Sequence, residues 1–167
     1  MLDESDSPIR HPDETASILT YRTGVQDANP AGNVHGGWVM KLCDDAAVIA
    51  ATRFARRRVV TATVDSLEFR SAVQVGDLLT LRATVNAAWR TSMEVGVQVE
   101  SENVATGQIT HVCTAYLTVV ALDHDGRPTA VPQLVPVSSE EKRRHEDANA
   151  RRKIRLAGAA RLGRGDG

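Results

Sequence analysis

The stretch QDANPAGNVHGGWVMKLCDDAAVIAATRFA, residues 26–55, decides the fold. It opens as a polar, glycine-rich loop and continues as an apolar, alanine-rich run from about Gly37 to Ala55. That run is long enough for a helix, and several arginines close it, which suits the negative end of a helix dipole. The sequence therefore predicts one long helix over 37–55, buried over most of its length.

The segments around this helix alternate apolar and polar residues and are rich in β-branched side chains, as strands are. They cover residues 17–23, 59–70, 79–91, 92–103 and 108–123. Helices and strands do not alternate in repeated βαβ units. We therefore expect an α+β fold in which an antiparallel sheet packs against the long helix.

The chain of 167 residues is long enough for one domain with a real core. We expect a disordered segment over 1–15, a folded domain over 16–137 and a charged helix and tail over 138–167. Ser138 and Glu141 have the spacing of a capping box at the start of that helix. The helix is either solvated, or it attracts phosphate, or it makes an oligomer contact.

The composition excludes several functional classes. A formal net charge of -1 shows no bias towards nucleic acid. The N-terminus is too acidic for a secretory signal, and no apolar run is long enough to span a membrane. The two cysteines and scattered histidines have no metal-ligand spacing. We expect a cytoplasmic protein with no metal and no cofactor.

Two adjacent aspartates interrupt the apolar run. Asp45 follows Lys41 by four residues, so the pair fits an ordinary surface ion pair on a helix. Asp44 falls on a stripe of small and apolar residues, where an unpaired carboxylate is costly. Asp44 therefore either makes a purely structural hydrogen bond to a neighbouring element or has a catalytic role.

The loop before the helix carries the other candidate residues. Gly36 and Gly37 stand where the first amides of the helix lack internal partners and can hold a developing negative oxygen. His35 fits a helix-entry residue or an acid/base. Asn29 fits a turn residue or a group that orients a water or a carbonyl.

Three motifs in one order resemble a known family. They are N-x-x-G-N-V-H-G-G from Asn29, K-L-C-D-D-A-A from Lys41, and V-T-A-T-V-D-S-L-E-F over 60–69. This order is similar to that of the hotdog-fold acyl-CoA thioesterases, in the subgroup of the cytosolic brain-type acyl-CoA hydrolase and its small bacterial relatives. The resemblance covers roughly residues 17–155.

The resemblance implies a single hotdog domain, with a long central helix wrapped by a curved antiparallel sheet. It also implies dimers formed by joining two sheets edge to edge, often as trimers of dimers, with active sites at the dimer interface. The implied reaction hydrolyses acyl-CoA to a free fatty acid and coenzyme A. The implied catalytic residues are Asn29, Asp44 and Gly37, with Asp44 as general base or nucleophile.

The phosphates of coenzyme A need cations at the mouth of such a site. The candidate substrate-binding residues are His35, Gly36, Arg56, Arg57, Arg58, Arg70, Arg90 and Ser92. For each arginine, a solvated surface residue is the commoner interpretation.

Two other functions stay open at this point. Hotdog enoyl-CoA hydratases carry a D-x-N-P signature that Asp27, Asn29 and Pro30 match, although the histidine is displaced to His35. A non-catalytic acyl-CoA-binding regulator is the second alternative, although the chain has no room for the DNA-binding helices such regulators carry.

Overall fold

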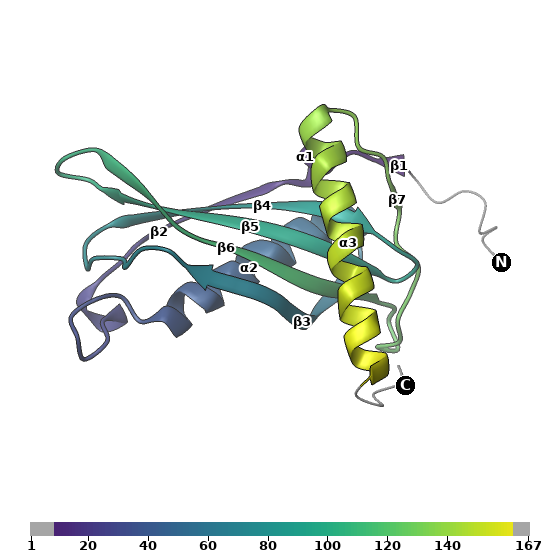
Figure 1. Ribbon diagram of the computed structural model, residues 1–167, viewed down its shortest axis with the longest axis horizontal. Coiled ribbons are helices and arrows are strands. Elements are labelled where there is room, and N and C mark those ends of the chain that lie inside the picture. Colours follow the sequence, from purple (N-terminus) through teal and green to yellow (C-terminus); the bar gives the residue numbers. More distant parts are fainter. Residues whose placement is uncertain (1–8, 162–167) are drawn as a thin grey trace.

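A computed structural model describes residues 9–161. A five-stranded antiparallel sheet with strand order β2-β4-β5-β6-β3 curls around the long helix α2 (Figure 1). The sheet strands are β2 (Ser17–Arg22), β3 (Arg58–Phe69), β4 (Leu78–Ala88), β5 (Ser92–Asn103) and β6 (Gln108–Leu122). The expected α+β hotdog architecture is confirmed.

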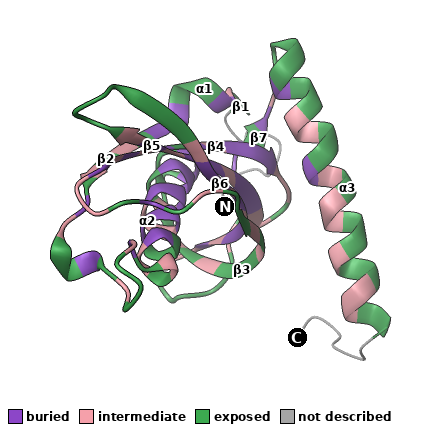
Figure 2. Cartoon of the chain, turned by 60° about the vertical axis from the view of Figure 1, so that its left-hand side comes forward, coloured by how far each residue is buried: buried purple, intermediate pink, exposed green. Residues whose placement is uncertain are grey.

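Helix α2 (Gly36–Ala55) fills the inside of the curled sheet (Figure 2). Its sheet-facing side is built from small and apolar residues, among which Ala46, Ala47 and Ala50 are fully buried. Small side chains let the helix axis approach the strands closely, and the larger Phe54 fills the far end of the core. The side of α2 that faces β3 stays partly open, with Met40 exposed.

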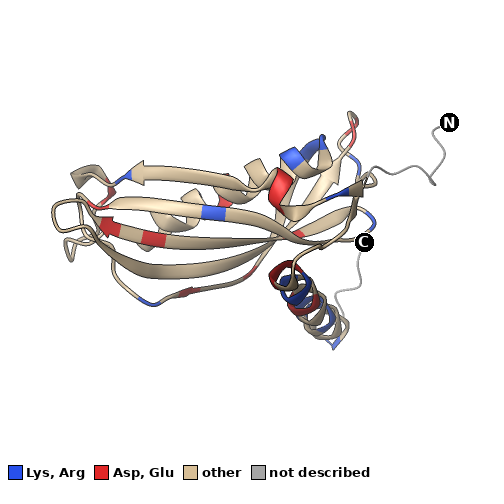
Figure 3. Ribbon diagram, turned by 90° about the horizontal axis from the view of Figure 1, so that it is seen from above, with Lys and Arg blue, Asp and Glu red and all other residues tan. Residues whose placement is uncertain are grey.

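The outer face of the sheet carries polar residues and is crossed by helix α3 (Ser139–Arg161). Seen from above, α2 and α3 lie on opposite faces of the sheet, and α3 carries most of the charge on its side (Figure 3). The capping box expected at its start is confirmed, because Ser138 Oγ accepts from the Glu141 N–H at 3.1 Å and Glu141 Oε2 accepts from the Ser138 N–H at 2.9 Å.

The expectation of disorder over 1–15 is wrong for residues 9–15. Strand β1 (Ile9–Arg10) pairs in parallel with β7 (Gln133–Leu134), and α1 (Pro12–Thr15) follows it. The pairing partner lies more than 120 residues away, so the polar composition of the segment gave no sign of it. Residues 1–8 and the tail 162–167 lie outside the described residues.

Candidate active site

Asp44 lies on the α2 face that looks towards β3. It is half-buried, and its Oδ1 accepts a hydrogen bond of 2.5 Å from Thr61 Oγ1 on β3. Its Oδ2 has no protein partner within residues 9–161. The carboxylate is thus held by one oxygen and free at the other, which is the arrangement a general base or a nucleophile needs.

The neighbouring Asp45 has the structural role expected of it. Its Oδ2 lies 2.6 Å from Lys41 Nζ, and both side chains are about half exposed. Such a pair contributes a few tenths of a kcal/mol to helix stability and no more. Asp45 therefore makes a surface ion pair, whereas Asp44 is bound to the sheet, and Asp45 is the natural control for mutations of Asp44.

The first turn of α2 differs from the expectation in one respect. His35 is its N-cap, and His35 Nδ1 accepts from the Gly37 N–H at 2.9 Å. The Gly37 amide is thus already hydrogen-bonded, and the Gly36 N–H is the first-turn donor without a protein partner in the described chain. The His35 ring serves here as a cap, the commoner of its two interpretations.

The loop before α2 is held rigidly from within. Asn29 Oδ1 accepts from the N–H groups of Ala31 and Asn33, at 2.9 and 3.2 Å, which is an Asx turn. This orientation leaves the two N–H groups of the Asn29 amide without a partner from residues 9–161. Asn29 is therefore a turn residue whose donor end is still available.

Asp27 is buried, at 4% exposure, and it ties this loop together. Its carboxylate accepts from the Tyr21 hydroxyl at 3.0 and 3.1 Å and from the Gly24 N–H at 2.8 Å. Its backbone carbonyl accepts from the His35 N–H at 2.7 Å. Asp27 and His35 are both engaged structurally, so the D-x-N-P match does not assemble the acid/base pair of a hydratase.

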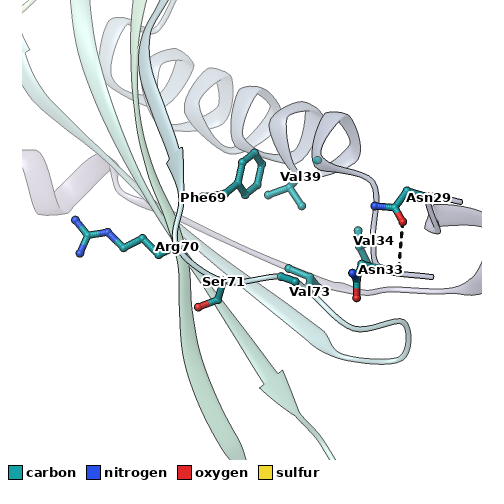
Figure 4. A pocket seen from close by; sticks show the side chains of 10 residues that line it. Asn29, Asn33, Val34, Val39, Phe69, Arg70, Ser71 and Val73 are labelled. Carbon is teal, nitrogen blue, oxygen red and sulfur yellow. Dashed lines mark hydrogen bonds between the residues drawn. The ribbon is translucent and has the colours of Figure 1, made fainter. Parts of the chain in front are cut away.

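A pocket of about 330 Å³ opens beside the start of α2 (Figure 4). Asn29 and Gly36 line it from the loop side, and Phe69 and Val39 form its apolar wall. Arg70 also belongs to the lining, although its guanidinium points away from Asn29 in this view. Asp44 does not line the pocket, because it stands two turns further along the helix.

The candidate substrate-binding residues fall into two groups at opposite ends of the sheet. The register pairs Arg58 with Leu122 and Ser92 with Val120, at the end where α2 finishes. Arg56, whose left-handed conformation (φ 52°) ends α2, Arg57 and Arg90 are exposed near this end. Gly36 and Arg70 lie at the other end, roughly 30 Å away along β3, because two register shifts shorten that strand.

Sequence reasoning missed Thr61 and Phe69. Thr61 faces inwards from β3, but register shifts at Ala62 and Asp65 break the alternation of this strand, so alternation was only a weak signal for Thr61. Its proximity to Asp44 depends on how the helix rotates against the strand, and a single sequence does not specify that rotation.

The exposed side of the edge strand β3 carries several large apolar side chains. Val60, Val64 and Phe69 are between 39% and 47% exposed, and Met40 and Ile49 of α2 are 45% and 37% exposed. A row of unpaired backbone groups flanked by apolar side chains is the property of a strand that pairs with another chain.

Residues 9–161 contain no group of three or more His, Cys, Asp and Glu side chains placed to hold a metal ion. Nor is any helix in that range both long and apolar enough to cross a bilayer.

Comparison with known proteins gives a consistent picture. The family model described as thioesterase superfamily matches residues 31–108. A solved structure, that of an apo-hexameric acyl-CoA thioesterase, is 40% identical, with a TM-score of 0.88, and the match covers 92% of this chain and 98% of that one. The acyl-CoA hydrolase from Staphylococcus aureus, solved with butyryl coenzyme A, coenzyme A and coenzyme A disulfide, is 33% identical over 93% of this chain and 95% of its own, with a TM-score of 0.86.

The same S. aureus hydrolase has also been solved as three variants, in which an asparagine, an aspartate and a threonine are each replaced by alanine. Among curated relatives, the cytosolic acyl coenzyme A thioester hydrolase of Rattus norvegicus is 34% identical over 151 residues. This chain spans 40% of the length of that relative, and the match covers 86% of this chain.

Proposed function

Because the chain belongs to the thioesterase superfamily, we propose that it hydrolyses acyl-CoA thioesters to a free fatty acid and coenzyme A. The observation that carries the proposal is the environment of Asp44, which is half-buried, bound at one oxygen by Thr61, and without a partner at the other oxygen among residues 9–161. The S. aureus hydrolase supports it, because the residue types altered in its variants are those of Asn29, Asp44 and Thr61.

The reacting groups come from two copies of the chain. Asp44 follows Gly37 by seven residues, which is about 10 Å of helix rise. One thioester group cannot contact both within a single chain. We propose that two chains pair through their open β3 strands, so that Asp44 of one copy faces Gly36, Gly37 and Asn29 of the other. The hexameric relative supports a further assembly into trimers of dimers.

In the proposed reaction the thioester carbonyl oxygen lies against the first turn of α2. The unpartnered Gly36 N–H serves it there, together with the Gly37 N–H when the His35 ring turns away. Asp44 Oδ2 either takes a proton from the water that attacks the carbonyl carbon, or attacks that carbon itself to form an anhydride that water then hydrolyses. In both routes the C–S bond breaks, and coenzyme A leaves as a thiolate that takes up a proton. The free N–H groups of Asn29 orient the water or the thioester. No metal or cofactor takes part in any step.

Antiparallel pairing of β3 also explains why the candidate arginines lie at opposite ends of the sheet in a single chain. It brings the Arg56, Arg57 and Arg58 end of one copy towards the Gly36 and Arg70 end of the other. We propose that these cations, with Arg90 and Ser92 nearby, bind the phosphates of coenzyme A. None of the five arginines has an ion-pair partner within residues 9–161. The proposed compartment is the cytoplasm, which the name of the rat relative supports, and nucleic acid and membranes are not proposed partners.

The experiment follows coenzyme A release from a panel running from acetyl-CoA to palmitoyl-CoA, using a thiol reagent. Asp44→Ala is compared with Asp45→Ala, the adjacent exposed aspartate. We expect Asp44→Ala to lower kcat by a factor of about 100 or more, as removal of a general base does. Asp45→Ala should keep nearly full activity.

Equal activity in the two variants would leave a thioesterase but remove Asp44 from its chemistry. No release from any substrate by an assembled wild-type protein would contradict the proposed function as a whole. The panel also ranks acyl-chain lengths, which the contacts of a single chain do not.

A further inference from the structure

Helix α3 changes character along its length. Its first half is densely charged, whereas residues 154–160, IRLAGAA, hold two large apolar residues and four small ones. Ile154 is 74% exposed and Leu156 is 41% exposed. This second half extends past the edge strand β3 in two views of the molecule (Figures 1 and 2). We call residues 151–161 the α3 strap.

The strap is fixed to the outer face of the sheet before the helix passes beyond the edge strand β3. Arg155 Nη1 donates to Asp65 Oδ2 of β3 at 2.9 Å and to Thr118 Oγ1 of β6 at 2.7 Å. The guanidinium of Arg152 stacks over the Trp89 ring, with its carbon 4.3 Å from the ring centroid. These contacts set where the helix crosses the edge strand, namely beside Asp65.

A groove of about 390 Å³ lies between the strap and the edge strand. Its strand side is formed by Thr63, Val64, Asp65 and Ser66, and its helix side by Arg151, Ile154 and Arg155. The middle of β3 (Arg58–Phe69) falls between residues 63 and 64. The groove thus sits at the point where a two-fold axis would pass if two β3 strands paired over their whole length.

Such a pairing has a geometric consequence for the helices. An axis between residues 63 and 64 puts Ala62 opposite the second copy's Asp65. The two crossing points are then three residues apart along the strands, about 7–10 Å, where the lower figure allows for the register shifts of β3 at Ala62 and Asp65. Helices in contact have axes 8–10 Å apart, so two straps crossing there would touch along their length.

From these observations we infer that the α3 straps of two chains pack against each other across the β3 seam, with Ile154 buried between them. The proposed occupant of the groove is therefore a second copy of this chain. The inference rests on the proposed pairing of β3 and adds to it an interface on the opposite face of the sheet from Asp44.

Cross-linking tests the contact directly. Ile154→Cys is treated with a short bismaleimide and run on a denaturing gel, beside Ile109→Cys. Ile109 is 62% exposed and lies on β6, at the far end of the sheet from the strap. The two native cysteines are buried and contribute no background. We expect a covalent dimer from Ile154→Cys and none from Ile109→Cys.

Sedimentation equilibrium gives a second, independent readout. Ile154→Glu places a charge at the buried contact of both copies, so the dimer dissociation constant should rise tenfold or more. Ile109→Glu should leave it unchanged.

The outcomes separate this inference from the proposed function. An assembled protein that releases coenzyme A, but whose Ile154→Cys variant gives no covalent dimer, would overturn the strap contact alone. Equal cross-linking of both cysteine variants would also overturn it. A monomeric wild type without thioesterase activity would overturn both.

Discussion

Thr61 Oγ1 donates a 2.5 Å hydrogen bond to Asp44 Oδ1, and this bond joins the central helix to the open edge strand. It restrains the rotation of the carboxylate and leaves Oδ2 without a protein partner among residues 9–161. A hydrogen bond to a charged group contributes about 1.5–3 kcal/mol. Its loss therefore has a measurable effect on the orientation of Asp44.

We expect Thr61→Ala to lower kcat by a factor of about 10 to 100 with little change in KM, because Asp44 is misoriented rather than removed. Thr61→Ser keeps the hydroxyl and should recover most of the rate. Steady-state kinetics with one acyl-CoA measures both. A Thr61→Ala variant with wild-type kcat would show that the bond serves architecture alone.

Glu94 is fully buried on the outer face of the sheet, and Arg151 of α3 binds both of its oxygens, at 2.6 and 3.1 Å. Arg151→Ala would leave the buried carboxylate without its counter-ion, although the Asn86 amide would still donate to it, so we expect a loss of about 3 kcal/mol in the free energy of unfolding. Urea denaturation measures this loss.

Arg143→Ala is the matched control for Arg151→Ala. Arg143 lies on the same helix, but its ion pairs with Glu140 and Asp147 are on the surface. Surface pairs contribute under about 1 kcal/mol, so this variant should be nearly as stable as wild type. Equal losses in the two variants would show that α3 is held by charge in general and not by Glu94.

Glu141 gives a pH-dependent prediction. Burial alone would raise its pKa, but N–H bonds from Ser138 and Val137 and the nearby Arg144 guanidinium outweigh burial and hold the pKa below its usual range. A lowered pKa means that the carboxylate stabilises the folded chain above the unfolded value of about 4.3. That contribution is lost as the pH falls below 4.3 and through the folded pKa.

Glu141→Gln should therefore be less stable than wild type at pH 7, by about 0.3–1 kcal/mol, the usual contribution of a negative charge at a helix N-terminus. The difference between the two proteins should shrink as the pH is lowered from 5 to 3. Thermal denaturation across this range measures it. A difference that stays constant with pH would assign the effect to packing and not to charge.

The two cysteines should be unreactive towards thiol reagents in the folded protein. Cys43 and Cys113 are at 1% and 0% exposure, and the hydrogen bond with Cys113 together with burial raises the pKa of the Cys43 thiol far above its usual range. A thiol reagent should therefore react with neither in the native state and with both in denaturant. Rapid reaction of the native protein would contradict the burial of this pair and would add a background to the coenzyme A assay.

Much of the fold was predictable because it depends on local patterns. The apolar run of α2, the alternation of the strands and the Ser138–Glu141 spacing each specify their element within a few residues. The pairing of β1 with β7 was not predictable, because it joins two short segments from opposite ends of the chain and neither has a strong pattern.

The features of the site were likewise only partly predictable from the sequence. A helical wheel identifies Asp44 as unusual, and the capping position of His35 can be read from its place before Gly36. The bond from His35 to Gly37, the partner of Asp44 on β3 and the separation of Arg58 from Arg70 all depend on how elements pack and register. Those relations are three-dimensional, and composition and spacing do not contain them.

The unpaired edge of β3 exposes a newly synthesised chain to pairing with other polypeptides. Between Arg58 and Glu68 the strand carries a single charge, Asp65, and an uncovered strand of this kind templates pairing with any extended polypeptide. A lone subunit is then exposed to aggregation until it meets a second one. In the proposed β3 dimer, dilution would remove the second copy's groups from each active site and would also expose the apolar edge of β3. Loss of activity on dilution should accordingly be reversible at first and become irreversible with time.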